Sequence, residues 1–304
     1  MSDNNQPSRK SNWGRWGDDD ERGALNLLNP DVVLAGLSAA TTGKIYSLGL
    51  PIQREGSAPI YGFRNPPQRL TSTNPGDPDD LVKFGAAPGV GSNEDVLILD
   101  SHGLSHMDAL SHVYADGSIY NGFSTDTIRT STGASRCGID KVGGIATRAV
   151  VLDMARYFDV EWVEPGYAIT SDDLAGAAAT QAIAVRPGNV LLVRTGFLDF
   201  WHSQKRTTNF LSQPGLGLDA VPFIRENDVV GVGMDNSAIE PIPFDRGVFL
   251  GVHLELLVQL GVYLFEHLNL NELAADRVSE CFIVIAPLLV SGASGSPINP
   301  IAIA

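Results

Sequence analysis

Three histidines and an aspartate gather within a short stretch in the first half of the chain. The segment DSHGLSHMDALSH, residues 100–112, carries His102, His106, Asp108 and His112, and the 304-residue chain contains six histidines in all. Neutral imidazole nitrogens and carboxylate oxygens are the usual protein ligands of zinc, and they also suit manganese and iron. The spacing therefore predicts a divalent-metal site, against the simpler alternative of loop histidines that only form hydrogen bonds.

The pattern also favours a catalytic site over a closed structural one. Two imidazoles and one carboxylate leave coordination positions open for water and substrate. His102 and His106 would share one face of a helix, whereas Asp108 would not, so we expect an extended or looped segment that turns Asp108 inward. His112 then remains free to act as a general acid or base, since the ordinary pKa of imidazole lies near neutrality.

The cluster resembles the HxGTHxDxPxH signature of the metal-dependent cyclase-family hydrolases, which include bacterial kynurenine formamidases and isatin hydrolases. Leu104-Ser105 and Leu110 depart from the Gly-Thr and Pro of that signature, while the four ligand-type residues match. Further stretches resemble the longer bacterial members: 13–26, 120–122, 192–196, 232–235 and 295–297. The resemblance implies that His102, His106 and Asp108 bind metal, and that His112 is catalytic.

The same resemblance implies a second metal site further along the chain. In two-metal formamidases a later histidine and glutamate complete this site, and the matching positions here are His253 and Glu266. Taken alone, His253 on an otherwise apolar helix face is more typical of a core residue. Whether one ion or two bind stays open, as does the choice between Zn²⁺ and Mn²⁺.

Two charged residues at strand ends have open roles. Arg194 either anchors a substrate carboxylate or forms a buried ion pair, and Asp235 either orients a ligand or caps the turn that follows it. Trp13, Trp16 and Phe63 either wall an aromatic pocket or pack in a core or an interface.

The elements that must position these residues alternate between strands and short helices. We expect strands at 44–51, 96–99, 147–154, 188–196, 229–235, 262–265 and 281–290, and helices at 169–181, 219–227 and 252–260. Residues 54–92 are rich in Pro, Gly, Asn and Asp, and predict a long functional loop such as a lid or an interface arm. The alternation favours one mixed α/β domain, and the family resemblance implies the swivelling β/β/α (cyclase-like) fold.

Composition bounds the remaining properties. The formal net charge of −14 argues against a nucleic-acid partner. No apolar run is long enough to span a bilayer, and the polar start of the chain lacks a signal peptide, so we expect a cytoplasmic protein with no membrane partner. We further expect a disordered N-terminal tail at 1–12, a hydrolase domain at 13–304 and a homodimer or homotetramer.

The resulting hypothesis is a divalent-metal-dependent hydrolase of a small-molecule amide, cyclic amide or lactone carbonyl. One rival is a non-haem iron oxygenase in which His106, Asp108 and His253 form a two-histidine, one-carboxylate site. This rival leaves His102 and His112 without a role. The second rival is a non-catalytic binding protein in which the metal is a structural clip. A closed structural site would not need His112.

Overall fold

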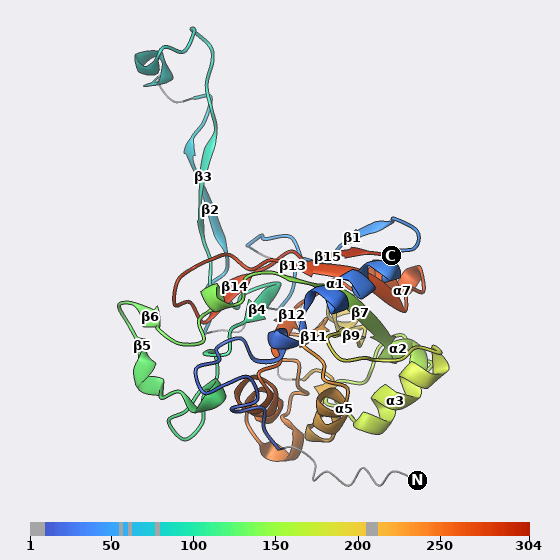
Figure 1. The fold of residues 1–304 in the computed structure, drawn as a ribbon. Helices are drawn as coiled ribbons and strands as arrows, with labels where there is room; N and C mark the ends of the chain where they lie inside the picture. The colour runs from blue at the N-terminus through green and yellow to red at the C-terminus, as the bar shows by residue number, and fades with distance from the viewer. Residues whose placement is uncertain (1–9, 55–56, 60–62, 77–79, 205–211) are drawn as a thin grey trace, which may run out of the picture.

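The computed structural model describes residues 10–304 except 55–56, 60–62, 77–79 and 205–211 (Figure 1). Within these residues one nine-stranded mixed sheet forms the centre of the molecule. Its strands, in spatial order, are β1 (Ile45–Ser47), β15 (Ile301–Ile303), β13 (Glu280–Ile285), β7 (Ile145–Asp153), β9 (Val190–Arg194), β11 (Gly231–Met234), β12 (Tyr263–Glu266), β4 (His106–Asp108) and β14 (Gly295–Pro297). The mixed α/β fold expected from the sequence is confirmed.

The middle of the sheet is parallel and deeply buried. β7, β9, β11 and β12 pair in parallel, and nearly every residue in them is buried. Buried parallel strands read as continuous apolar runs because both faces are covered. In β11 a side chain at Gly233 would lie 2.7 Å from the methyl groups of Leu192 and Leu268, so glycine permits this close packing.

Short helices connect the strands and cover the sheet. They are α1 (Pro30–Gly36), α2 (Met154–Tyr157), α3 (Ser171–Thr180), α4 (Phe197–Ser203), α5 (Val221–Glu226), α6 (Gly251–His253) and α7 (Asn271–Ala275). α3 begins at a capping box, in which Thr170 and Asp173 satisfy each other's backbone N–H groups. In the described part of the chain, no helix combines the length and the apolar character needed to cross a membrane.

The helix expected at 252–260 has an unusual geometry. It starts as α6 and continues from Leu254 to Leu260 as a π-helix, η9. π-Helical turns are rare and frequently occur at functional sites. The wide turns begin immediately after His253, one of the predicted metal ligands.

A two-stranded arm extends far from the body of the molecule (Figure 1). It consists of β2 (Gln68–Thr73) and β3 (Glu94–Ile98), which pair antiparallel. The long loop expected at 54–92 is therefore wrong in part, because β2 lies inside it. β3 is the strand expected before the histidine cluster, but it is exposed along its whole length. Nothing in the described chain covers the apolar side chains of the arm, which include Leu70, Val96, Leu97 and Ile98.

The ends of two other predicted segments differ from the structure. β13 stops at Ile285 rather than residue 290, since Pro287 cannot donate to a strand ladder. Residues 1–9 of the predicted disordered tail lie outside the described residues. Its last residues are ordered: Asn12 is buried, and its side chain donates to the carbonyl of Leu260 at 2.6 Å. The predicted tail therefore extends too far toward the C-terminal side.

Candidate metal centre

Strand β4 carries two of the predicted ligands on one face. His106 and Asp108 are two residues apart, and alternate residues of a strand point to the same side. β4 lies between β12 and β14, with His106 opposite Glu266 and Asp108 opposite Gly295. Of the extended and looped alternatives expected for this segment, the structure has the extended one, and the strand geometry itself turns Asp108 inward.

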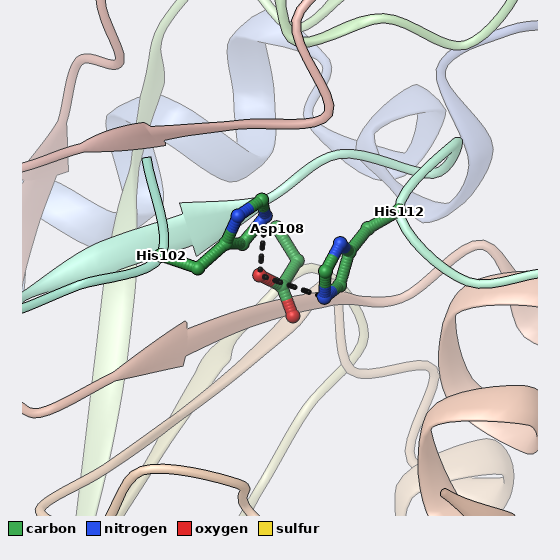
Figure 2. A group of neighbouring side chains, drawn as sticks. All are labelled: His102, Asp108 and His112. Carbon is green, nitrogen blue, oxygen red and sulfur yellow. Dashed lines mark ion pairs between the residues drawn. The ribbon is translucent and has the colours of Figure 1, made fainter. Parts of the chain in front are cut away.

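The first group of ligand-type atoms surrounds one oxygen of Asp108 (Figure 2). Nε2 of His102 lies 3.4 Å from Asp108 Oδ1, and Nε2 of His112 lies 4.0 Å from the same oxygen. The two imidazole rings are stacked, with their centroids 3.9 Å apart. Structure and sequence agree that these three side chains meet.

A second group lies on the buried side of Asp108 and includes both distant residues implied by the resemblance. His106 Nε2 lies 3.4 Å from both Asp108 Oδ1 and Glu266 Oε2. His253 Nε2 lies 3.3 Å from Glu266 Oε1 and 3.8 Å from Asp108 Oδ2. Asp108 therefore stands between the two groups, and all six predicted site residues come together.

The donor set fits divalent metal ions. Both carboxylate oxygens of Asp108 are buried, and neither has a hydrogen-bond partner among the described residues. A buried charge without a partner is costly, and buried charges are normally paired or coordinate metals. With metal–ligand bonds of about 2.0–2.1 Å, two ligands of a tetrahedral ion lie roughly 3.3 Å apart. The shorter separations here match that value and are too long for hydrogen bonds.

The imidazoles on the outer side are neutral. Burial lowers the pKa of His102 to about 3 and that of His112 to about 4, although Asp108 acts against the change. Neutral imidazole is the form that binds metals. In the inner group the carboxylates prevail over burial: the hydrogen bond to Glu240 and the nearby charge of Glu266 raise the pKa of His253 to about 10.

The centre opens to solvent on one side. The side chains of His106, Asp108, His253 and Glu266 are at most 3% exposed, whereas His102 is 12% and His112 is 24% exposed. Arg64, at the base of the arm, donates a hydrogen bond to the backbone carbonyl of His102 on this side. A small molecule can therefore reach the group from the direction of His102 and His112.

Two further buried residues, which sequence reasoning did not identify as part of the site, adjoin the centre. Oε1 of Glu240 accepts hydrogen bonds from the backbone N–H of His253 at 2.9 Å and from its Nδ1 at 2.6 Å. The ring of His267, whose nitrogens have no hydrogen-bond partner in the described chain, lies 6.4 Å from that of His106. Neither belongs to a periodic pattern or a local motif, so the sequence offers no signal for them.

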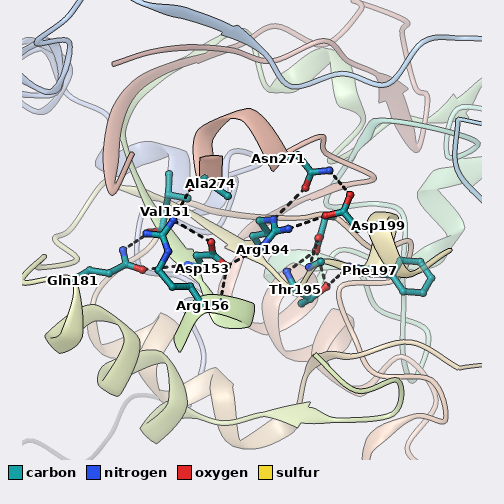
Figure 3. Close-up of polar contacts among 12 residues, drawn as sticks. Val151, Asp153, Arg156, Gln181, Arg194, Thr195, Phe197, Asp199, Asn271 and Ala274 are labelled. Atoms are coloured by element: carbon teal, nitrogen blue, oxygen red, sulfur yellow. Dashed lines mark hydrogen bonds and ion pairs between the residues drawn. The ribbon is translucent and has the colours of Figure 1, made fainter. Parts of the chain in front are cut away.

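Arg194 and Asp235 have structural contacts of their own. The guanidinium group of Arg194 donates to Asp153 at 3.1 Å and to Asp199 at 2.8 Å, which favours the ion-pair alternative (Figure 3). Asp235 accepts three hydrogen bonds from Thr195 and Gly196 at 2.8–2.9 Å. It therefore caps the turn after β9 rather than the turn that follows Asp235 itself.

Of the aromatic residues considered for a pocket, Phe63 is 79% and Trp13 is 40% exposed. Trp13 donates its indole N–H to the carbonyl of Val258, and Trp16 packs against the main core. The two tryptophans therefore fasten the start of the described chain to the body.

Comparisons with known proteins agree with this geometry. Residues 46–241 match the family model named Cyclase. A solved structure described as a novel cyclase is 37% identical, covers 98% of this chain and 99% of its own, and superimposes with a TM-score of 0.88. The search of curated proteins found no match.

More distant solved structures share the fold. Isatin hydrolase A from Labrenzia aggregata is 18% identical, with 90% of this chain and 97% of that chain covered and a TM-score of 0.62. A predicted metal-dependent hydrolase from Bacillus stearothermophilus is 21% identical, with 85% and 97% covered and a TM-score of 0.51. The family match over most of the chain, together with the 37% identical structure, shows that this protein belongs to the cyclase family.

Proposed function

We propose that the protein is a divalent-metal-dependent hydrolase that opens an amide, cyclic amide or lactone carbonyl of a small molecule. The observation that carries this proposal is the buried, unpartnered carboxylate of Asp108 with imidazole nitrogens on both sides. The isatin hydrolases that share the fold act on a cyclic amide, which supports this class of bond.

The proposed ligands form two groups that share Asp108. His102 and Asp108 would hold an ion at the open side, and His106, Asp108, Glu266 and His253 would hold an ion on the buried side. When bound, Zn²⁺ or Mn²⁺ supplies Lewis-acid polarisation of the carbonyl and lowers the pKa of water. The deeply buried inner ligands exclude bulk solvent, which strengthens electrostatic interactions in the site.

His112 is the proposed general acid and base. It is the most exposed of the six side chains, and its Nε2 lies farthest from Asp108 Oδ1 among the nitrogens facing that atom. In this role Nε2 takes a proton from the attacking water and delivers it to the leaving nitrogen or oxygen. Its stacking on His102 orients the ring.

The two rivals account for less of the site. An oxygenase triad of His106, Asp108 and His253 leaves Glu266, which lies 3.3 Å from His253, without a role. A structural clip requires a closed coordination sphere, whereas His102 and His112 face an open side.

The test is hydrolysis by the metal-loaded protein of a panel containing isatin, a formanilide and simple lactones. We expect ring opening or deformylation of at least one class, and loss of that activity in Asp108→Asn. Absence of hydrolysis across all three classes would contradict the proposal.

We also propose that the arm joins this chain to a second copy in a homodimer or homotetramer. A two-stranded hairpin is at best marginally stable alone in water, and Leu70, Leu97 and Ile98 are each more than half exposed. A second apolar patch, Leu288 to Val290, is exposed on the body. An arm and an apolar patch on the same chain suit a reciprocal contact between two copies.

Light scattering after size exclusion tests this contact. We expect the native protein to have at least twice the mass of one chain and Leu97→Asp to have the monomer mass. The matched control is Leu34→Asp, at an exposed position of α1 away from the arm. A monomeric native protein would contradict the proposal.

A further inference from the structure

Glu240 is a buried carboxylate that contacts the proposed metal centre without belonging to its ligands. Its carboxylate is 1% exposed, and the single oxygen Oε1 accepts both the backbone N–H and the ring Nδ1 of His253. An ionised carboxylate only accepts hydrogen bonds. The 2.6 Å contact therefore requires that Nδ1 of His253 carries a hydrogen.

That requirement fixes what the other ring nitrogen can do. With one hydrogen on Nδ1, Nε2 is the ring atom that faces Glu266 Oε1 at 3.3 Å and Asp108 Oδ2 at 3.8 Å. In the metal-free site a proton on Nε2 offsets the two carboxylates, and a metal ion that displaces this proton would bind the Nε2 lone pair. Metal-bound histidines commonly donate their second N–H to a carboxylate in this way, which fixes the tautomer and raises ligand basicity.

The backbone on both sides of this contact is held in an unfavourable conformation. Ile239, directly before Glu240, has φ +56°, and Leu250, directly before α6, has φ +53°. For a β-branched residue such as isoleucine a positive φ is a genuine outlier. Such strain persists only where the surroundings impose it, and it clusters at functional sites.

Neighbouring residues hold the Glu240 segment in place. Gln213 donates its side-chain N–H to the carbonyl of Glu240 at 2.9 Å and pairs with Ile242 through both backbone groups. Ser237 in turn donates to the side-chain oxygen of Gln213 at 3.0 Å. Glu240 is therefore anchored independently of His253, as a residue that orients another must be.

We infer that Glu240 is a positioning residue of the metal centre, which holds His253 in the tautomer and orientation that present Nε2 to the ion shared with His106, Asp108 and Glu266. The inference rests on the metal site of the proposed function. The rival role for the same contact is a helix cap, in which Glu240 accepts the backbone N–H of His253 and only stabilises α6. That role would affect folding stability and leave metal affinity unchanged.

The experiment is a titration of the metal-free protein with Co²⁺, followed by the visible absorption of the bound ion, together with the bound metal by mass spectrometry. Glu240→Gln keeps the shape of the side chain and removes its charge. We expect its affinity for the inner ion to fall by about 10–100-fold, the range typical of lost partners behind metal-bound histidines. The Co²⁺ spectrum should change as well.

Asp235→Asn is the matched control. Asp235 is also a 1% exposed carboxylate that accepts several backbone and side-chain hydrogen bonds, but these go to Thr195 and Gly196. It should bind Co²⁺ as the native protein does, even if its melting temperature falls. Should Glu240→Gln not fold, Glu240→Asp retains the charge but shortens the reach to Nδ1, and the same loss is expected.

A double-mutant cycle tests whether Glu240 acts through His253. In a His253→Gln background, Glu240→Gln should cause no further loss of Co²⁺ affinity, because contacting residues of one network are not additive. Native affinity in Glu240→Gln, or fully additive losses in the cycle, would overturn the inference. A native protein that binds no Co²⁺ would instead overturn the proposed function itself.

Discussion

Replacement of His112 by alanine separates the proposed acid–base role from a role as metal ligand. The imidazole is 24% exposed at the open side and stacks on His102. Its removal should leave the fold and both groups of ligands in place. We therefore expect His112→Ala to bind as much metal as the native protein and to lose most of its turnover.

The size of each effect follows from the position of the ring. General acid–base catalysis contributes about 10²–10⁴-fold to kcat, or roughly 3–5 kcal/mol in the activation barrier. Surface substitutions usually change stability by no more than about 0.5 kcal/mol. Because the ring of His112 is partly exposed and its main contact is the stack with His102, the loss in free energy of unfolding should be about 1 kcal/mol. The catalytic loss should therefore exceed the stability loss several-fold.

Three measurements decide the matter: kcat and KM on the hydrolysed substrate, bound metal per chain, and the midpoint of urea unfolding. Because the space left by the ring is open to solvent, added imidazole should restore part of kcat in His112→Ala. His202→Ala, at an exposed position of α4, is the control and should behave as the native protein. Native kcat in His112→Ala would refute the reasoning, as would the loss of one bound ion.

Two further substitutions test the architecture around the site. Gly295→Ala would place a methyl group against Nε2 of His102. We therefore expect a titration to show weaker metal binding, with little change in the far-ultraviolet circular dichroism. Unchanged affinity would show that the position of His102 does not depend on its packing against Gly295. Arg194→Met removes the closer of two guanidinium groups beside the buried carboxylate of Asp153, with Arg156 remaining at 3.5 Å, and should lower the free energy of unfolding in urea by about 2 kcal/mol with native metal content. A loss of metal would contradict the structural role of Arg194.

The local part of the site could be predicted from the sequence, because four ligand-type residues stand within one short segment. The resemblance supplied His253 and Glu266, which no local pattern could connect with the cluster. Glu266 reaches it through the pairing of β12 with β4, where it stands opposite His106, and His253 reaches it from the end of α6. That register depends on the order of strands in the whole sheet. The sequence of a single short strand such as β4 does not indicate which strand pairs with it.

The features that the sequence did not predict also have physical explanations. β4 is three residues long, so the alternation that places His106 and Asp108 on one face was too short to decide between an extended and a looped segment from the sequence. Both strands of the arm are exposed on both faces, so β2 lacks the apolar alternation of a half-buried strand. Glu240 contacts a residue thirteen positions later through a strained loop, for which sequence periodicity gives no signal.

The central claim is that this constellation of imidazoles and carboxylates holds a divalent metal required for hydrolysis. The most direct test measures bound metal and turnover on the same sample, before and after treatment with a chelator and after addition of Zn²⁺ or Mn²⁺. We predict one or two ions per chain, loss of activity with the metal, and recovery when the ion is restored. Metal-free protein that still hydrolyses its substrate at the native rate would contradict the claim.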